Sequence, residues 1–161
     1  MWLEDDFLKR PGYVRDISLQ LQYKGPTKYD YWRGYRAEMP VNLFDEIGKD
    51  ILDLLNINRA NLKMFFAYQT KEIDVSDEAS KHVDTSDFAG VIYLTPNPPK
   101  NTGTILYNDK ENIKSIYENK YNRLIAYNSK ILHAPQKCFG DNINNARMTI
   151  TFFLNTERKN V

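Results

Sequence analysis

This sequence has few histidines, a single cysteine, almost no net charge and no long apolar run. Its 161 residues include two histidines and one cysteine, and 22 basic residues nearly balance 21 acidic ones, for a formal charge of +1. This balance excludes a bulk electrostatic footprint for nucleic acid or an anionic membrane, and leaves only local patches open. No apolar run approaches the roughly 20 residues that span a bilayer, so we expect a soluble protein that does not bind membranes.

The single cysteine, Cys138, excludes an intrachain disulfide. The acidic start Met1 to Asp6 lacks the basic and apolar regions of a secretory signal. We therefore expect a cytoplasmic protein. With 42% hydrophobic residues, the chain is long enough for one sizeable core and too short for two comfortable domains, which predicts a single domain over residues 1–161.

The first third of the sequence is patterned as a helical support, residues 1–61. Apolar spacing predicts one helix within residues 11–23 and a second one whose apolar stripe runs over residues 43–55, with Asn42 as its N-cap. Between them, the aromatic and basic stretch Tyr23 to Met39 indicates irregular structure or short strands.

From Leu62 the hydrophobic period changes to that of short strands separated by turn-forming clusters. The polar stretch 109–119 indicates a surface helix or a loop. The order of helices first and strands afterwards favours a mainly β protein, an antiparallel sandwich or barrel core over residues 62–154 with N-terminal helices. The predicted strands are 62–69, 88–95, 103–107, 123–127, 131–134 and 147–154.

The two histidines and one aspartate form a candidate metal site. Residues two apart share one side of an extended strand but lie about 200° apart on a helix, so His82 and Asp84 can chelate one ion only from strand-like backbone. His133 would then arrive from a distant strand, and two imidazoles with one carboxylate leave positions open on an octahedral ion. The competing interpretation is structural, with His82 capping a turn and His133 buried in the core.

The last predicted strand alternates, and its two faces differ in chemistry. Its apolar side chains take one face, while Arg147, Thr149 and Thr151 share the other. A guanidinium and a hydroxyl so placed suit one carboxylate of a dicarboxylate whose other end reaches the metal. Tyr93 is a further candidate donor, and Tyr68 a weaker one. Alternatively, the polar face of the strand is solvated and the tyrosines are ordinary core residues.

Five short motifs follow one another in a characteristic order. They are H-V-D at 82–84, V-I-Y-L at 91–94, G-T-I-L-Y at 103–107, L-H-A-P at 132–135 and R-M-T at 147–149. In these motifs, over roughly residues 62–154, the sequence is similar to the iron(II)- and 2-oxoglutarate-dependent oxygenases, in particular their prolyl-hydroxylase-like branch. That resemblance implies a double-stranded β-helix, an eight-stranded jelly-roll of the cupin type.

The resemblance also implies roles for the candidate residues. It makes the metal Fe(II), with 2-oxoglutarate and O2 as cosubstrates and ascorbate as an added reductant, and it implies hydroxylation of a substrate with release of succinate and CO2. The prime substrate is open: a peptide or protein side chain is favoured over a small molecule. The implied metal ligands and catalytic residues are His82, Asp84 and His133, and the implied 2-oxoglutarate contacts are Arg147, Thr149, Tyr93 and Tyr68.

Two other functions fit part of the pattern. A zinc hydrolase could use the same three ligands with an open fourth position, but it leaves Arg147 and Thr149 without a role. A non-catalytic jelly-roll module could hold a ligand without turnover. The stretch from Tyr23 to Arg36 could clamp a peptide or stack on a base and its phosphate, or it could simply pack on the N-terminal part.

Overall fold

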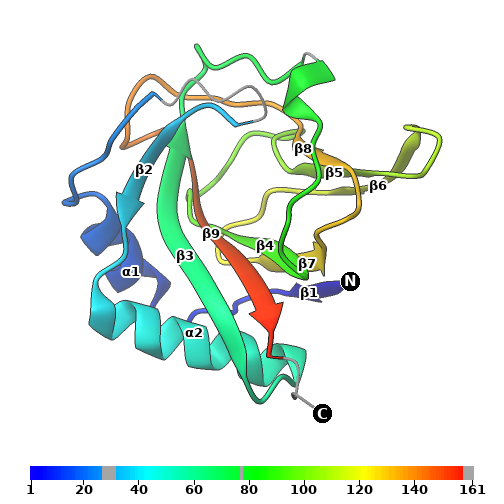
Figure 1. Ribbon diagram of the computed structural model, residues 1–161. Helices are drawn as coiled ribbons and strands as arrows, with labels where there is room; N and C mark the ends of the chain where they lie inside the picture. The colour runs from blue at the N-terminus through cyan, green and yellow to red at the C-terminus, as the bar shows by residue number, and fades with distance from the viewer. Residues whose placement is uncertain (27–31, 77, 158–161) are drawn as a thin grey trace.

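The computed structural model describes residues 1–26, 32–76 and 78–157. Within them, nine strands form two antiparallel sheets, and two helices accompany the larger one (Figure 1). The larger sheet has the spatial order β1-β7-β4-β9-β3-β2, and the smaller one the order β6-β5-β8. The larger sheet comprises β1 (Trp2–Glu4), β2 (Tyr35–Glu38), β3 (Ala60–Gln69), β4 (Phe88–Tyr93), β7 (Leu124–Asn128) and β9 (Arg147–Thr156).

The smaller sheet and the helices complete the architecture. The smaller sheet comprises β5 (Thr104–Tyr107), β6 (Ile113–Tyr117) and β8 (His133–Pro135). The helices are α1 (Pro11–Ser18) and α2 (Val41–Leu55), and one 3-10 turn spans Glu78–Ser80. Neither helix is long and apolar enough to cross a membrane, nor is any other helix in the part of the chain that the structure describes.

Helix α2 covers one face of the larger sheet, as Figure 1 shows, and the main core lies between them. Strand alternation explains this core, because the even-numbered residues of β9 from Met148 to Leu154 point toward the helices. Burying these large apolar side chains contributes about 1.5–3 kcal/mol each. The buried cluster includes Leu43, Ile47, Ile51 and Leu55 of α2, Met64 and Phe66 of β3, and Met148, Ile150, Phe152 and Leu154 of β9.

The other face of the larger sheet looks toward the smaller sheet, and a second buried cluster fills part of the space between them. Strand β9 lies in the middle of the larger sheet and pairs along its length with β3 and along half of it with β4. Its odd-numbered side chains, from Arg147 to Phe153, therefore line the space between the sheets. This placement positions the candidate site.

The expected mainly β architecture is confirmed, and each of the six predicted strands coincides with an observed one to within a few residues. The stretch 109–119 was wrongly predicted as a helix or loop, because Ile113–Tyr117 forms strand β6. Ile113 and Ile116 are exposed on this outer strand, which removes the apolar alternation by which a half-buried strand is recognised.

The N-terminal support is less purely helical than expected. Strands β1 and β2 also belong to it and form the two edges of the larger sheet. The N-cap prediction was wrong: Pro40 occupies that position in extended geometry, Asn42 lies in the first turn, and no side chain caps the helix. The fixed φ of proline, here −55°, fits the extended backbone that leads into the helix.

Candidate metal and cosubstrate site

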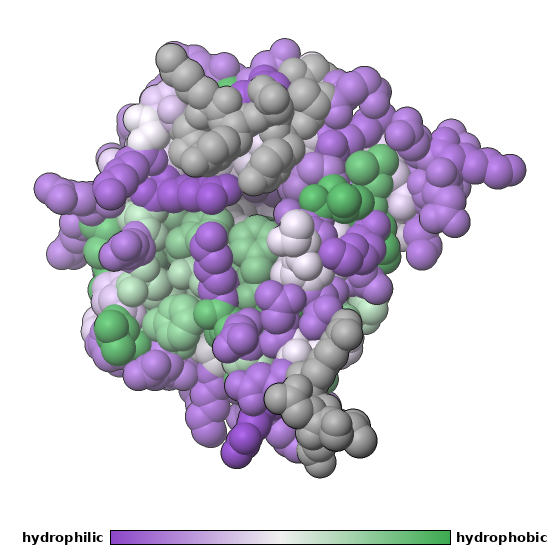
Figure 2. All heavy atoms as spheres, in the orientation of Figure 1, coloured by the Kyte–Doolittle hydropathy of each residue, from purple (hydrophilic) through white to green (hydrophobic). Residues whose placement is uncertain are grey.

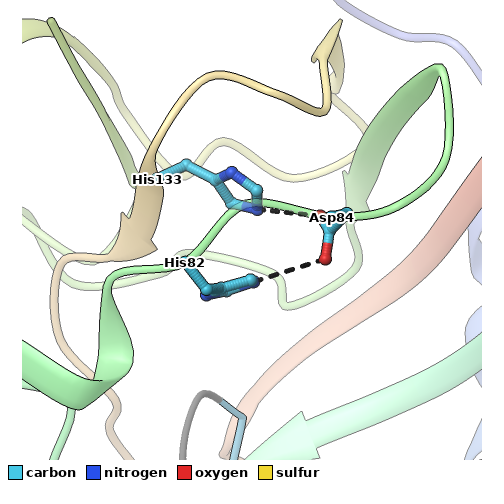
Figure 3. A group of neighbouring side chains, drawn as sticks. All are labelled: His82, Asp84 and His133. Carbon is cyan, nitrogen blue, oxygen red and sulfur yellow. Dashed lines mark ion pairs between the residues drawn. The ribbon is translucent and has the colours of Figure 1, made fainter. Parts of the chain in front are cut away.

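The two histidines and Asp84 converge at one end of the space between the sheets (Figure 3). His133 opens β8, and His82 pairs with it through an isolated bridge in which each backbone N–H donates to the other's carbonyl at 3.0 Å. Asp84 follows on the same extended segment. Its Oδ1 lies 3.7 Å from Nε2 of His82 and its Oδ2 lies 3.1 Å from Nε2 of His133. The extended backbone expected for the H-x-D segment is thus present, although as a single bridge instead of a full strand.

Hydrogen bonds to the backbone orient both imidazole rings. Nδ1 of His82 lies 2.9 Å from the carbonyl of Ser80, and Nδ1 of His133 lies 2.8 Å from that of Ile131. Because a carbonyl only accepts, each Nδ1 carries the proton and each basic Nε2 faces Asp84, which is the arrangement typical of metal-ligating histidines. Burial lowers the pKa of His82, and the nearby His133 lowers that pKa further, so the neutral form that binds metal is favoured.

The backbone around Asp84 is held by the turn that precedes β8. Its N–H donates to the carbonyl of Ser129 at 2.8 Å, and Lys130 donates to its carbonyl at 3.0 Å. The side-chain atom Oδ2 is buried and accepts no hydrogen bond from any described residue. A buried carboxylate oxygen without a donor is costly unless a cation satisfies it. The three residues therefore fit a divalent metal, and the ligand set leaves other positions on it open.

The same pocket contains a buried guanidinium. The three candidate ligands and Arg147 line one pocket together, and this pocket is open to the surface. Arg147 is 5% exposed and donates to the carbonyls of Thr102 and Gly103 at 3.0 and 3.2 Å and to Oε1 of Gln69 at 3.4 Å. No described carboxylate forms an ion pair with it. A buried cation held only by neutral oxygens is a ready binding point for an anion.

Two of the other predicted residues lie beside this guanidinium. Thr149 follows on β9 and lines the pocket, with its hydroxyl 3.0 Å from that of Thr151. Tyr93 is fully buried, with its ring 5.6 Å from the Arg147 guanidinium and its hydroxyl 2.6 Å from that of Thr104. Burial raises the pKa of Tyr93, so its phenol stays protonated. Thr104 lines the pocket and stands between the phenol and the pocket space.

The structure does not bring Tyr68 to this site. Side chains alternate along β3, so Gln69 faces the pocket while Tyr68 packs on the helical side of the sheet. Its ring stacks on Tyr35 with centroids 4.5 Å apart and also meets Tyr23 edge-on at 4.9 Å. Tyr68 therefore has a packing role in the core, and the predicted contact with a cosubstrate does not match this placement.

The pocket also contains residues that the sequence did not single out. Gln69 anchors Arg147, and the Tyr127 ring lies 4.8 Å from the ring of His133. The antiparallel register places Gln69 opposite Arg147, and only knowledge of that pairing could have found it. Tyr127 ends a predicted strand, but nothing distinguishes it there from ordinary core residues.

The aromatic and basic stretch from Tyr23 to Arg36, which runs into β2, is divided between two roles. Trp32 and Arg36 line the pocket, and the Arg36 guanidinium lies over the Trp32 ring at 4.1 Å. Tyr23 and Tyr35 pack against Tyr68 instead. The other candidates in this stretch, Lys28, Tyr29 and Tyr31, lie outside the described residues.

Comparison with solved structures defines the class of fold. The jelly-roll that encloses this pocket is the fold of the prolyl-hydroxylase-like 2-oxoglutarate oxygenases. One similar structure is a Trichoplax adhaerens prolyl hydroxylase in complex with a peptide fragment of the hypoxia inducible factor oxygen degradation domain. Its TM-score is 0.69 at 13% identity, over 95% of this chain and 82% of the other. No protein-family model and no curated protein sequence matches the chain.

Two bacterial structures show the same likeness. A Pseudomonas putida prolyl-4-hydroxylase gives a TM-score of 0.64 at 12% identity, over 98% of this chain and 92% of the other. Streptomyces hygroscopicus HygX, with nickel, 2-oxoglutarate and hygromycin B bound, gives 0.66 at 11% identity, over 96% of this chain and 82% of the other. At such low identity the likeness establishes the fold, and the chemistry has to be argued from the residues of this chain.

Proposed function

We propose that this protein is an Fe(II)- and 2-oxoglutarate-dependent dioxygenase that hydroxylates its substrate and releases succinate and CO2. The observation that supports the proposal best is that one pocket contains both a candidate metal-ligand cluster and the Arg147 guanidinium. A largely buried cluster of two histidines and one carboxylate lies at one place, and a buried guanidinium without a carboxylate partner among the described residues lies at another. A dicarboxylate that chelates a metal at one end needs such a cation at its other end.

In this proposal, each residue group has a separate task. His82, Asp84 and His133 would hold the iron, which supplies O2 activation when it is bound together with 2-oxoglutarate. Arg147 would hold the distal carboxylate by two parallel N–H bonds, and the Thr149 hydroxyl would add a donor. Because Gln69 and two carbonyls fix the guanidinium, the cosubstrate would bind with little rearrangement of the protein.

Tyr93 supports this arrangement indirectly. Its phenol contacts the Thr104 hydroxyl at 2.6 Å, so Thr104 is the group that presents an oxygen to the pocket. We therefore assign Tyr93 a positioning role and leave direct contact with the cosubstrate to Arg147 and Thr149. The protein contributes orientation, exclusion of water and placement of one C–H bond, and the mechanism needs no general base.

For the substrate, we propose a peptide or protein side chain. The prolyl hydroxylase with the same fold holds a peptide fragment in its structure, which supports this class. HygX holds the small molecule hygromycin B, so the fold itself does not restrict the substrate to peptides.

The competing functions explain fewer of the observations. A zinc hydrolase would use the three ligands but leaves the buried Arg147 without a function. A non-catalytic module would be favoured by a closed metal site, whereas here the ligands line a pocket that opens to the surface. Competition by a non-reactive 2-oxoglutarate analogue separates the enzymes, because a hydrolase would ignore it.

The test is succinate formation by the purified protein with Fe(II), ascorbate and 2-oxoglutarate. We expect slow uncoupled turnover without substrate, faster turnover with a matching peptide, and loss of both in His82→Ala and Asp84→Ala. Asp109→Ala is the matched control, because Asp109 lies on the far hairpin near β6 and outside the pocket. An iron-loaded protein that neither binds nor turns over 2-oxoglutarate would overturn the proposal.

A further inference from the structure

A groove leads from the metal site to the surface along the larger sheet. It shares Arg36, Asp84 and Phe153 with the central pocket, so the two spaces adjoin at the candidate metal ligand. Its lining also includes Lys63, the residues that follow Asp84 and a cross-strand pair of asparagines. The remaining lining residues are Asn61, Leu62, Val83, Thr85, Ser86 and Asn155.

The register of β3 and β9 explains the chemistry of its floor. Gln69 pairs with Arg147 at the inner end, Phe65 pairs with Thr151, and Lys63 pairs with Phe153 further out. Because alternate residues share a face, Gln69, Phe65 and Lys63 all point to the pocket side. Along this face of the sheet, the cation Arg147 is therefore followed by the rings of Phe65 and Phe153 and then by a second cation, Lys63.

Two aromatic rings pack against Arg36 where pocket and groove meet. Its guanidinium lies over the Trp32 ring at 4.1 Å and over the Phe65 ring at 4.5 Å. Because aromatic rings lie against this guanidinium, an anion would bind Arg36 at its N–H edge. Stacking also reduces the rotamer entropy that Arg36 would lose when it binds a ligand.

The charges of the groove have one predominant sign. Among the described residues that line it, Arg36 and Lys63 are basic and Asp84 alone is acidic. Asp84 is a candidate metal ligand, so a bound divalent ion would neutralise it. Lys63 is exposed and forms no ion pair with a described residue. In the view of Figure 2, hydrophobic atoms gather over β2 and β3 with hydrophilic side chains among and around them, so apolar and charged surface adjoin there.

We propose that the prime substrate carries an anionic group, a carboxylate or a phosphate, that Arg36 and Lys63 bind in this groove next to the metal site. This inference rests on the proposed function, because it treats the groove as part of an oxygenase active site. The anion recognised here is separate from the cosubstrate carboxylate, which would bind Arg147, two strands away from Arg36 on the same sheet face. Arg36 and Lys63 would thus determine specificity without taking part in the oxidation.

Trp32 provides a direct readout of this subsite. The chain has two tryptophans, and Trp2→Phe leaves Trp32 as the single reporter, stacked on Arg36. The Trp2→Phe protein, loaded with redox-inert Zn(II) and saturated with 2-oxoglutarate, is titrated with phenylacetate, phenyl phosphate and the neutral phenylacetamide. We expect a saturable change in Trp32 fluorescence with at least one of the two anions and at least tenfold weaker binding of the amide. The preferred anion distinguishes a carboxylate from a phosphate on the substrate.

Variants assign the response to the two cations. We expect Lys63→Gln to weaken anion binding several-fold and Arg36→Lys to weaken it about tenfold, because lysine keeps the charge but loses the fork. Lys114→Gln, at an exposed lysine on the outer strand β6, is the matched control and should change nothing. Arg147→Gln should also leave the Trp32 response intact, since it removes the cation of the other end.

Some results would overturn the inference. Equal binding of the amide and the anions would show that the groove binds by stacking alone, and an unchanged affinity in both Lys63→Gln and Arg36→Lys would remove its recognition residues. A response lost only in Arg147→Gln would mean that the anions enter the cosubstrate end. The readout does not depend on turnover, so a protein that binds anions at Arg36 but forms no succinate would contradict the proposed function and leave the groove assignment standing.

Discussion

Replacement of Arg147 provides the sharpest test of the cosubstrate assignment. Its guanidinium is 5% exposed, lines the pocket of the candidate metal ligands, and pairs with no described carboxylate. In Arg147→Gln, a bound 2-oxoglutarate carboxylate would be buried without its cation. Breaking a buried charge pair by removing one partner costs about 3–5 kcal/mol. Since about 1.4 kcal/mol corresponds to tenfold in affinity, 2-oxoglutarate should bind roughly a hundred- to a few thousand-fold more weakly.

Two milder replacements grade the effect. Arg147→Lys keeps the charge but loses the bidentate geometry, which costs about 1.5–3 kcal/mol, or roughly ten- to a hundredfold in the Kd for 2-oxoglutarate. Thr149→Val removes one neutral hydroxyl of a residue that is 3% exposed, and should cost about 1 kcal/mol, or roughly fivefold. The expected order of affinity is therefore wild type, Thr149→Val, Arg147→Lys and Arg147→Gln.

The assay is calorimetric titration of 2-oxoglutarate into protein loaded with redox-inert Zn(II). Arg147 makes no hydrogen bond to His82, Asp84 or His133, so metal affinity should stay within about twofold in each variant and serves as the internal check on folding. The surface replacement Arg59→Gln is the matched control. An Arg147→Gln protein that binds metal normally and 2-oxoglutarate within threefold of the wild type would refute the assignment.

Three further predictions concern packing and titration. In Gly90→Ala, the new Cβ would lie 2.2 Å from Cζ of Phe152 and 2.5 Å from the carbonyl of Ile125, so urea unfolding should show a loss of about 1–3 kcal/mol or more in the free energy of unfolding. Burial raises the pKa of Cys138 to about 11, so the native thiol should resist a thiol reagent at mildly alkaline pH and react once the protein unfolds. The contribution of Cys138 to the free energy of unfolding should fall as the pH rises from the unfolded pKa of 9 toward 11. Arg123 and then Lys120 lower the pKa of Asp5 to about 2, so this carboxylate stabilises the fold at pH above its unfolded pKa of 3.8 and loses that effect as the pH falls toward 2. Asp5→Asn should remove this pH dependence. Because the group is partly exposed, the variant should cost about 1 kcal/mol or less in the free energy of unfolding at neutral pH.

The grouping of the candidate metal ligands could be predicted from the sequence because their spacing carries information about the backbone. Only an extended segment brings His82 and Asp84 to one side, and two histidines leave little choice of partner. The odd-numbered face of β9 was predictable for the same reason. Because side chains alternate along a strand, the sequence indicates which residues share a face, and the face with the apolar residues is the one that packs in the core.

Tyr68 shows where this reasoning ends. It precedes Gln69 on β3, so a difference of one residue decides between the pocket and the helical core. The sequence around it, Met64-Phe65-Phe66-Ala67, is apolar on both faces and gives no alternation from which to choose. One face of this strand packs on α2 and the other faces the smaller sheet. A strand buried on both faces shows no alternation of apolar and polar residues in the sequence.

Arg36 shows a second limit, because its placement depends on strand pairing. Strand β2 pairs with β3 so that Arg36 lies opposite Ala67, and the small methyl group leaves room for the guanidinium to lie across the neighbouring Phe65 ring. The sequence indicates a cluster of aromatic and basic residues but not which cation stacks on which ring. The pairing decides that Arg36 faces the metal end of the sheet while Tyr35, one residue earlier, packs on Tyr68 in the core. In the proposed enzyme, the register of this edge strand would thus set substrate specificity. A one-residue shift of β2 would exchange a cationic side chain at the pocket for a phenolic one without changing any candidate metal ligand.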